Sequence, residues 1–121
     1  MALPENRNLV IYKGDTFSLS FRLRQKQTSG APGAYVDLTG CTPKAQIRAT
    51  EDSTTVLQEF TATLGDQTNV DTVGQVNLVI SSADTANLSP GVWDVQVTYP
   101  DNTVTTYLRG SVTVTKEVTR A

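Results

Sequence analysis

SPGVWDVQVTYPDNTVTTYLRGSVTVT, residues 89–115, is the stretch that decides the fold of this chain. Its first half alternates apolar side chains, from Trp93 to Tyr99, with polar ones, and residues 100–102 (PDN) then reverse the chain. In the second half, the side chains expected on one face are those of Val104, Thr106, Leu108, Gly110, Val112 and Val114. A period of two with turn residues between the halves predicts an antiparallel β-hairpin. Trp93, in register with its apolar neighbours, is expected to be the largest side chain of the core.

The rest of the chain supplies shorter segments with the same period. The other predicted strands are residues 8–13, 16–24, 35–38, 44–49, 55–64 and 75–81. Within the fifth of these, Gln58 interrupts a row of apolar side chains, which predicts a bulge or an edge position. These segments are expected to supply the strands with which the hairpin pairs and against which it packs.

Between the strands, two polar stretches, residues 25–34 and 65–74, are predicted to be long loops. Residues 82–88 are the one segment of helical character, with Ser82 able to cap it, and we expect them to bridge two sheets. Evenly spaced strands of this length predict a β-sandwich or a barrel. We favour an all-β, immunoglobulin-like sandwich of two antiparallel sheets, with about eight short strands and one short helical turn.

Length and composition indicate a single domain, residues 1–121, with a flexible lead-in at 1–7 and a polar tail at 116–121. Since the sequence starts with Met1 and ends on this short tail, we expect a complete small protein. The hydrophobic fraction of 38% and the net charge of −2 argue against disorder. We find no signal peptide and no apolar run of membrane-spanning length, and no block of charge indicates nucleic-acid binding.

Side chains for catalysis are scarce. The sequence has no histidine, which removes the usual general base, proton shuttle and metal ligand together. Its single cysteine, Cys41, cannot form an internal disulfide and has no histidine to activate it, so we interpret it as a small, half-buried apolar residue. We therefore predict a protein that is not an enzyme and that has no cofactor and no metal.

Acidic side chains give no clear site. Asp66, Asn69 and Asp71 share one loop, but their spacing does not match a calcium-binding EF-hand loop, so a solvated turn is the favoured interpretation. The carboxylates of Asp37, Glu59 and Asp94 are scattered over different segments. Two such groups can form a glycosidase pair, but no pair stands out.

Arg22, Arg24 and Lys26 form the only basic cluster, on the face of their segment that is predicted to be exposed. Aromatic side chains for base stacking are not expected on that face, because Phe17 and Phe21 point the other way. Ordinary solubility is one interpretation. The other is a contact surface for an acidic partner, and these three residues are our candidate interaction site.

A set of short motifs follows one another in a particular order. They are Gly14-Asp15, Asp37-Leu38-Thr39-Gly40, Ala45-Gln46-Ile47-Arg48, Gly74-Gln75-Val76, Pro90-Gly91, Trp93-Asp94-Val95-Gln96, Pro100-Asp101, Gly110-Ser111-Val112 and Val118-Thr119-Arg120. In this order the chain resembles the N-terminal domain of phage baseplate upper proteins, and small virion proteins of tailed phages built on the same domain. The resemblance covers residues 8–120.

This resemblance implies a structural component of a tailed-phage virion, made in the host bacterial cytoplasm and acting through protein–protein contacts. Its partners would be other virion proteins of the tail, the baseplate or the capsid, and its own copies in a homo-oligomer. No fibre-forming or receptor-binding region follows Arg120 in this sequence. A baseplate or tail adaptor and a capsid decoration protein therefore both remain open.

Two other function classes remain as alternatives. A carbohydrate-binding β-sandwich module is the alternative function, and it would require exposed aromatic side chains, for which Tyr12, Tyr35 and Tyr107 are the candidates. A hydrolase with a carboxylate pair has the least support, because no acid in the sequence is set apart from the others.

Overall fold

The computed structural model describes residues 5–24 and 34–116 of the chain. Within these ranges nine strands and one short helix follow one another. The strands are β1 (Glu5–Asn6), β2 (Leu9–Tyr12), β3 (Phe17–Arg22), β4 (Thr42–Arg48), β5 (Gln58–Glu59), β6 (Thr61–Leu64), β7 (Gln75–Ile80), β8 (Gly91–Thr98) and β9 (Val104–Thr115), and the helix is α1 (Ser82–Thr85).

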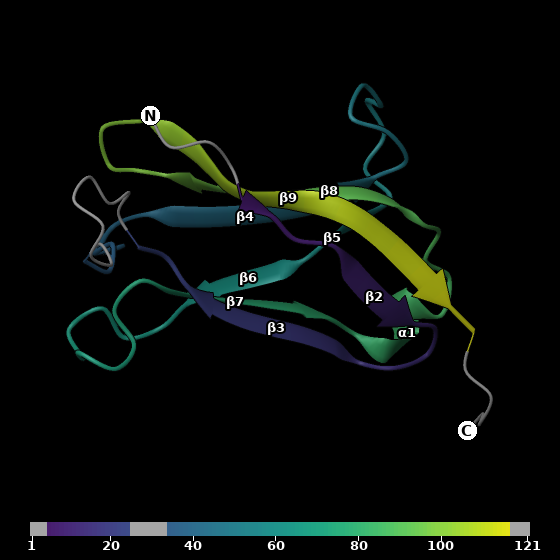
Figure 1. The fold of residues 1–121 in the computed structure, drawn as a ribbon, viewed down its shortest axis with the longest axis horizontal. Coiled ribbons are helices and arrows are strands. Elements are labelled where there is room, and N and C mark those ends of the chain that lie inside the picture. The colour runs from purple at the N-terminus through teal and green to yellow at the C-terminus, as the bar shows by residue number, and fades with distance from the viewer. Residues whose placement is uncertain (1–4, 25–33, 117–121) are drawn as a thin grey trace.

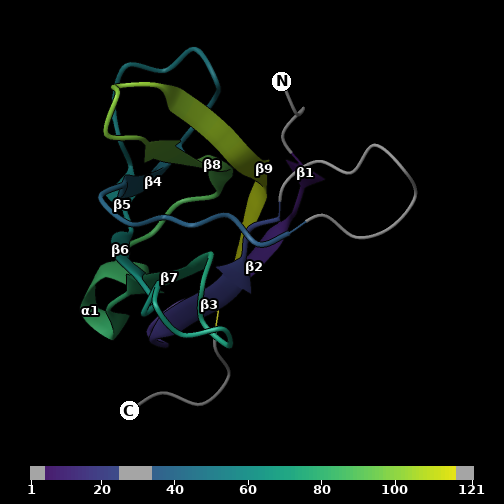
Figure 2. The same ribbon diagram turned by 90° about the vertical axis from the view of Figure 1, so that its left-hand side faces the viewer.

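The strands form two sheets that face each other across one core (Figure 1). The larger sheet, sheet A, has the order β1-β9-β8-β4-β5, and β2 also pairs with β9; the smaller, sheet B, has the order β3-β7-β6. Figure 2 shows the two sheets as separate layers. The all-β, two-sheet sandwich is thus confirmed, while the immunoglobulin-like topology stays a prediction.

One edge of sheet A differs from the predicted antiparallel arrangement. β1 and β2 both pair with β9 in the parallel direction, with Glu5 opposite Leu108 and Leu9 opposite Val112. Parallel neighbours need a long crossover connection, and here nearly the whole domain separates the first strands from the last. β1 also corrects the predicted lead-in, because Glu5 and Asn6 belong to the sheet, while residues 1–4 lie outside the described part.

The hairpin that dominates the sequence is confirmed as β8 and β9, and Trp93 is buried at 3% exposure. The register shifts between Val95 and Gln96, which leaves Tyr107 as an extra residue in β9. A bulge of this kind moves the following side chains to the opposite face. The prediction that Val104 and Thr106 share the inner face with Leu108 is therefore wrong; Val104 is 51% exposed.

The segment 55–64 divides between the two sheets. β5 pairs with β4 in sheet A, whereas β6 pairs with β7 in sheet B. Between them Phe60 is buried, and its N–H donates to the carbonyl of Ala45. The break in pattern at Gln58 marks this change of sheet, and the predicted edge position is confirmed because β5 ends sheet A.

Residues 35–38 are not the predicted strand. Tyr35 forms only an isolated bridge with Arg24, and the next residues run as a loop although Val36 and Leu38 are buried. The Leu38 N–H donates to the side chain of Gln67 instead of to a strand. Side chain–backbone bonds of this sort replace a β-ladder for a short apolar segment.

An aromatic row fills the centre of the core. The Phe60 ring lies 6.1 Å from that of Phe17 and 5.8 Å from that of Trp93. The indole Nε1 of Trp93 donates to the Arg7 carbonyl at 2.8 Å, and Trp93 lies opposite Gly110 on β9. A Cβ at Gly110 would overlap the Arg7 carbonyl, so only glycine allows the N-terminal segment to lie this close.

Helix α1 lies between β7 and β8 and so bridges the two sheets, as predicted, but Ser81 caps it rather than Ser82. Its Thr85 is fully buried, and the Thr85 hydroxyl donates to the Asp15 carbonyl at 2.7 Å and accepts from the Gly14 N–H at 3.1 Å. Since Gly14 and Asp15 turn the chain from β2 of sheet A into β3 of sheet B, this hydroxyl joins the helix to the link between the sheets.

Candidate functional site

The outer face of sheet A carries polar side chains in rows that cross three strands. Because β4, β8 and β9 pair in register, Gln46 lies opposite Asp94, which lies opposite Arg109. The next row towards the N-terminal end of β8 has Arg48 opposite Val92, which lies opposite Ser111. Residues far apart in the sequence thereby form one surface.

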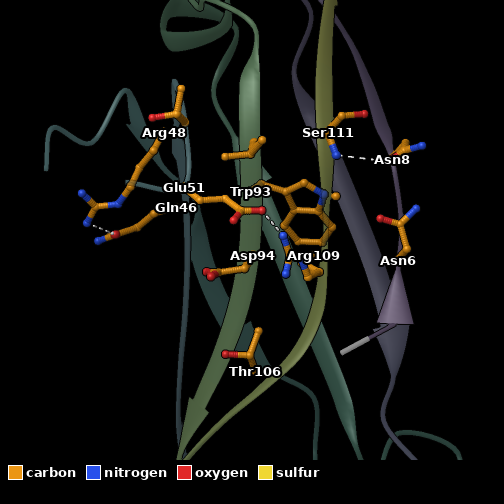
Figure 3. Close-up of a pocket in the computed structure, with 13 residues that line it drawn as sticks. Asn6, Asn8, Gln46, Arg48, Glu51, Trp93, Asp94, Thr106, Arg109 and Ser111 are labelled. Carbon is orange, nitrogen blue, oxygen red and sulfur yellow. Dashed lines mark hydrogen bonds and ion pairs between the residues drawn. The ribbon is translucent and has the colours of Figure 1, made fainter. Parts of the chain in front are cut away.

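A hollow of about 550 Å³ lies over these rows. Its lining comes from β1 and the link after it, β4 and the loop after it, β8 and β9: Asn6, Asn8, Gln46, Arg48, Thr50, Glu51, Val92, Trp93, Asp94, Thr106, Arg109, Gly110 and Ser111. Figure 3 shows Asp94 projecting from β8 between Gln46 and Arg109. The volume falls in the range typical of sites for small ligands.

One wall of the hollow is the loop that follows β4. Arg48 holds this loop through a bond from Nη1 to the Ser53 carbonyl at 2.8 Å, and its Nη2 donates to Gln46 Oε1 at 3.0 Å. Further along the loop, Glu51 reaches across β8 and forms an ion pair with Arg109 (Figure 3). Both members of this pair are more than half exposed, so the pair spans the hollow at its solvent side.

The opposite wall is the link between β1 and β2. There the Asn8 side-chain oxygen accepts from the Ser111 N–H at 3.1 Å, and the Arg7 N–H donates to the Arg109 carbonyl at 2.7 Å. Gly110 makes room for this link, as described for the core. The hollow is therefore bounded by fixed backbone on the one side and by a loop held by side chains on the other.

Asp94 is the chemically distinctive group of the site. Burial raises the pKa of its carboxyl, while the nearby charges of Arg48 and Arg109 oppose that shift. Within residues 5–24 and 34–116, no hydrogen bond reaches the Asp94 side chain, whereas Arg48 and Arg109 each have acceptors. Asp94 is thus a half-buried carboxylate whose oxygens remain open to a hydrogen-bond donor.

In the predicted basic cluster, Arg22 and Arg24 contact an aromatic side chain of the protein itself. The Arg22 and Arg24 guanidinium groups lie 3.5 and 4.2 Å from the centre of the Tyr35 ring, and Arg24 donates to the Tyr35 hydroxyl at 2.6 Å. Arg22 also donates to the carbonyls of Val70 and Val73. The expectation that no aromatic lies on that face is wrong. Lys26 lies outside the described residues, and the interaction surface stays a prediction.

The loop residues that were considered as a cation site form hydrogen bonds with their own neighbours in the loop. Asp66 accepts from the N–H and hydroxyl of Thr68, which lower the pKa of the Asp66 carboxyl, and Asn69 accepts from the Asp71 N–H. In the part of the chain that the structure describes, no three acidic, cysteine or histidine side chains cluster as metal ligands. The solvated turn predicted from the sequence agrees with these bonds.

Cys41 and the other carboxylates are also separate from the hollow. Cys41 is half-buried against the core, and burial raises the pKa of its thiol. Asp37 accepts from Thr39 in its own turn. Glu59 lies on β5, which β4 separates from Asp94 on β8, and it accepts from the side chain of Gln46 on β4. These three carboxylates do not converge on one point.

Sequence reasoning missed most of the hollow. It singled out Asp94 only as one of several scattered carboxylates and did not single out Arg48, Glu51 or Arg109. A signal does exist: Gln46 and Arg48 are two apart, as are Val92 and Asp94, so each pair lies on one outer face. The register that joins the pairs, however, is not readable from either segment alone.

Comparison with known proteins adds no relative: no protein-family model matches the chain, and no curated protein matches it. Among the described residues there is also no helix long and apolar enough to cross a membrane.

Proposed function

We propose that this chain is a non-enzymatic structural component of a tailed-phage virion, acting through protein–protein contacts as a baseplate or tail adaptor or as a capsid decoration protein. Support comes from the order of motifs along the sequence and from the two-sheet sandwich that the resemblance implies. The observation that carries the contact role is an open edge of sheet A at β2, which belongs to an assembling protein more readily than to a lone domain.

The edge at β2 is open and partly apolar. Within the described residues, β2 pairs with β9 alone, and Val10 and Tyr12 on its outer face are 54% and 50% exposed. Arg7 and Lys13 donate their N–H groups to β9, so by alternation the N–H and C=O of Val10 point away from β9. A strand could extend the sheet at this position.

A second copy of the chain fits this edge. In an antiparallel pairing of two β2 strands that sets Val10 opposite Tyr12 of the second copy, the exposed apolar side chains of the two residues meet. Such contacts favour cross-strand pairing. The two-fold symmetry of such a contact is the commonest arrangement in soluble oligomers. We therefore propose a homo-oligomer joined through β2.

Two measurements test these proposals separately. Mass spectrometry of purified virions of the encoding phage should detect the chain in mature particles, and its absence would overturn the virion role.

Light scattering after size exclusion should give a dimer or larger species that Val10→Lys reduces to monomer. Val104→Lys is the matched control, because Val104 is 51% exposed on β9, away from β2. A wild-type monomer, or equal effects of both variants, would overturn the β2 contact.

A further inference from the structure

The hollow of sheet A has a balance of charge that restricts its ligand. Its lining contains two cationic side chains, Arg48 and Arg109, and two anionic ones, Glu51 and Asp94. The cations are engaged by acceptors of the protein itself, because Arg48 donates to Ser53 and Gln46 and Arg109 pairs with Glu51. Within the described residues, Asp94, at the centre of its row, is the charged side chain of the lining that takes part in no hydrogen bond.

This arrangement disfavours charged ligands of either sign. An anion would meet the like charges of Asp94 and Glu51, and these two carboxylates already balance the charges of Arg48 and Arg109. A cation drawn to Asp94 would meet Arg48 and Arg109 on both sides. A neutral molecule with hydroxyl donors has neither conflict, and a hydroxyl that donates to a carboxylate makes one of the stronger hydrogen bonds in proteins.

We propose that this hollow is a binding site for a neutral saccharide, in which Asp94 accepts hydrogen bonds from two adjacent hydroxyl groups of one sugar ring. Asn6 and Thr106 line the same hollow and offer an amide and a hydroxyl to the other ring substituents, and Val92 offers an apolar contact to a ring face. Since Trp93 is buried at 3% exposure, recognition here uses polar groups and not an aromatic platform. The site is independent of whether the chain belongs to a virion.

The test is a titration of the isotope-labelled protein, followed by NMR, with the methyl glycosides of glucose, galactose, mannose and rhamnose, each to about 50 mM, a range that detects weak binding. At least one sugar should shift amide signals of residues 46–51, 92–94 and 106–111 and leave sheet B unshifted. Asp94→Asn should weaken that binding at least about tenfold, because it removes the charge that strengthens the bonds.

Asp52→Asn is the matched control, since Asp52 is exposed in the same loop but does not line the hollow. It should leave the affinity unchanged. If the spectrum of Asp94→Asn were that of an unfolded chain, Asp94→Ser would replace it. The proposal is overturned if none of the four sugars shifts those signals, if Asp94→Asn binds as well as wild type, or if acetate or methylammonium shifts the same signals at lower concentration.

Discussion

The two outer faces of the sandwich follow the same strand rule and yet differ in chemistry. Three strands cross each face in register, and each has a polar row at its centre. On sheet A that row is Gln46, Asp94 and Arg109; on sheet B it is Ser20, Asn77 and Thr63. The strands of sheet B contain a single charged residue, Arg22, whereas the central row of sheet A alone contains two, Asp94 and Arg109.

The difference shows which polar side chains a solvated sheet face requires. Sheet B satisfies its central row with a neutral bond, from the Ser20 hydroxyl to the Asn77 side-chain oxygen at 2.7 Å. Sheet A instead places a half-buried carboxylate between two guanidinium groups and covers it with a loop, although burial of the charge opposes ionisation. Solubility alone does not require that arrangement, which is why we assign a ligand to sheet A and none to sheet B.

The largest expected effect comes from removing the support beneath the face of sheet A. Trp93→Ala should lower the free energy of unfolding by about 3–5 kcal/mol, because it leaves a cavity beside Phe60 and frees the Arg7 carbonyl. Urea unfolding followed by circular dichroism measures it, since the variant has no tryptophan. Val79→Ala, on the outer face of sheet B, should cost less than about 1 kcal/mol. Similar losses for the two variants would contradict the structure.

Removing the Thr85 hydroxyl, which joins helix α1 to the link between the two sheets, should have an intermediate effect on the free energy of unfolding. Thr85→Val keeps the shape of a fully buried side chain but leaves the Gly14 N–H and the Asp15 carbonyl without their partner. We expect a loss of about 1–3 kcal/mol in the free energy of unfolding. Thr61→Val, at an exposed position of sheet B, is the matched control and should stay within about 0.5 kcal/mol of wild type. A loss no greater than that of the control would show that the hydroxyl bonds are unimportant.

The loop that covers sheet A should respond locally. Glu51→Gln removes the ion pair with Arg109, and since both side chains are more than half exposed, the stability change should be under about 1 kcal/mol. Hydrogen exchange of residues 49–57 should nevertheless become faster, because the Arg48 bond to the Ser53 carbonyl is then the remaining side-chain bond that ties the loop to β4. Asp52→Asn is expected to leave that exchange unchanged. Equal exchange in wild type and Glu51→Gln would mean that the ion pair does not hold the loop.

Much of the fold was predictable because burial has a local signature. Strict alternation located β3, β7, β8 and β9, and the interrupted alternation at Gln58 marked a real edge. The face of Val104 and Thr106 was not predictable, since a run of Thr, Thr and Tyr can place its bulge at several positions without breaking the pattern. β1 was missed because two polar residues have no period, and their partner strand is about a hundred residues away.

The candidate site was less predictable than the fold because it depends on register. The basic cluster was selected by nearness in the sequence, but Arg22 and Arg24 meet at Tyr35, a residue from another segment. In the hollow, Gln46, Asp94 and Arg109 lie far apart in the sequence and become neighbours only through the pairing of three strands. The pattern within one strand shows on which face of the sheet a side chain lies. It does not show which side chains of the neighbouring strands lie beside it.

The smallest expected change in stability is that of Asp94→Asn, which tests the difference between the outer faces of the two sheets most directly. Asp94→Asn gives the central row of sheet A the amide that Asn77 gives sheet B. Because burial raises the pKa of Asp94 above its ordinary value of 3.8, the folded state binds the proton more tightly than the unfolded state. Wild-type stability should therefore fall as the pH rises from about 4 through the raised pKa, and the variant should not show this loss.

Above that range the variant should equal or exceed wild type by about 0.5 kcal/mol, as measured by urea unfolding at several pH values. If Asp94→Asn instead destabilised the fold at neutral pH, the carboxylate would be a structural partner of Arg48 and Arg109. A gain in stability together with a loss of sugar binding would mean that the chain keeps Asp94 for its ligand and not for its fold.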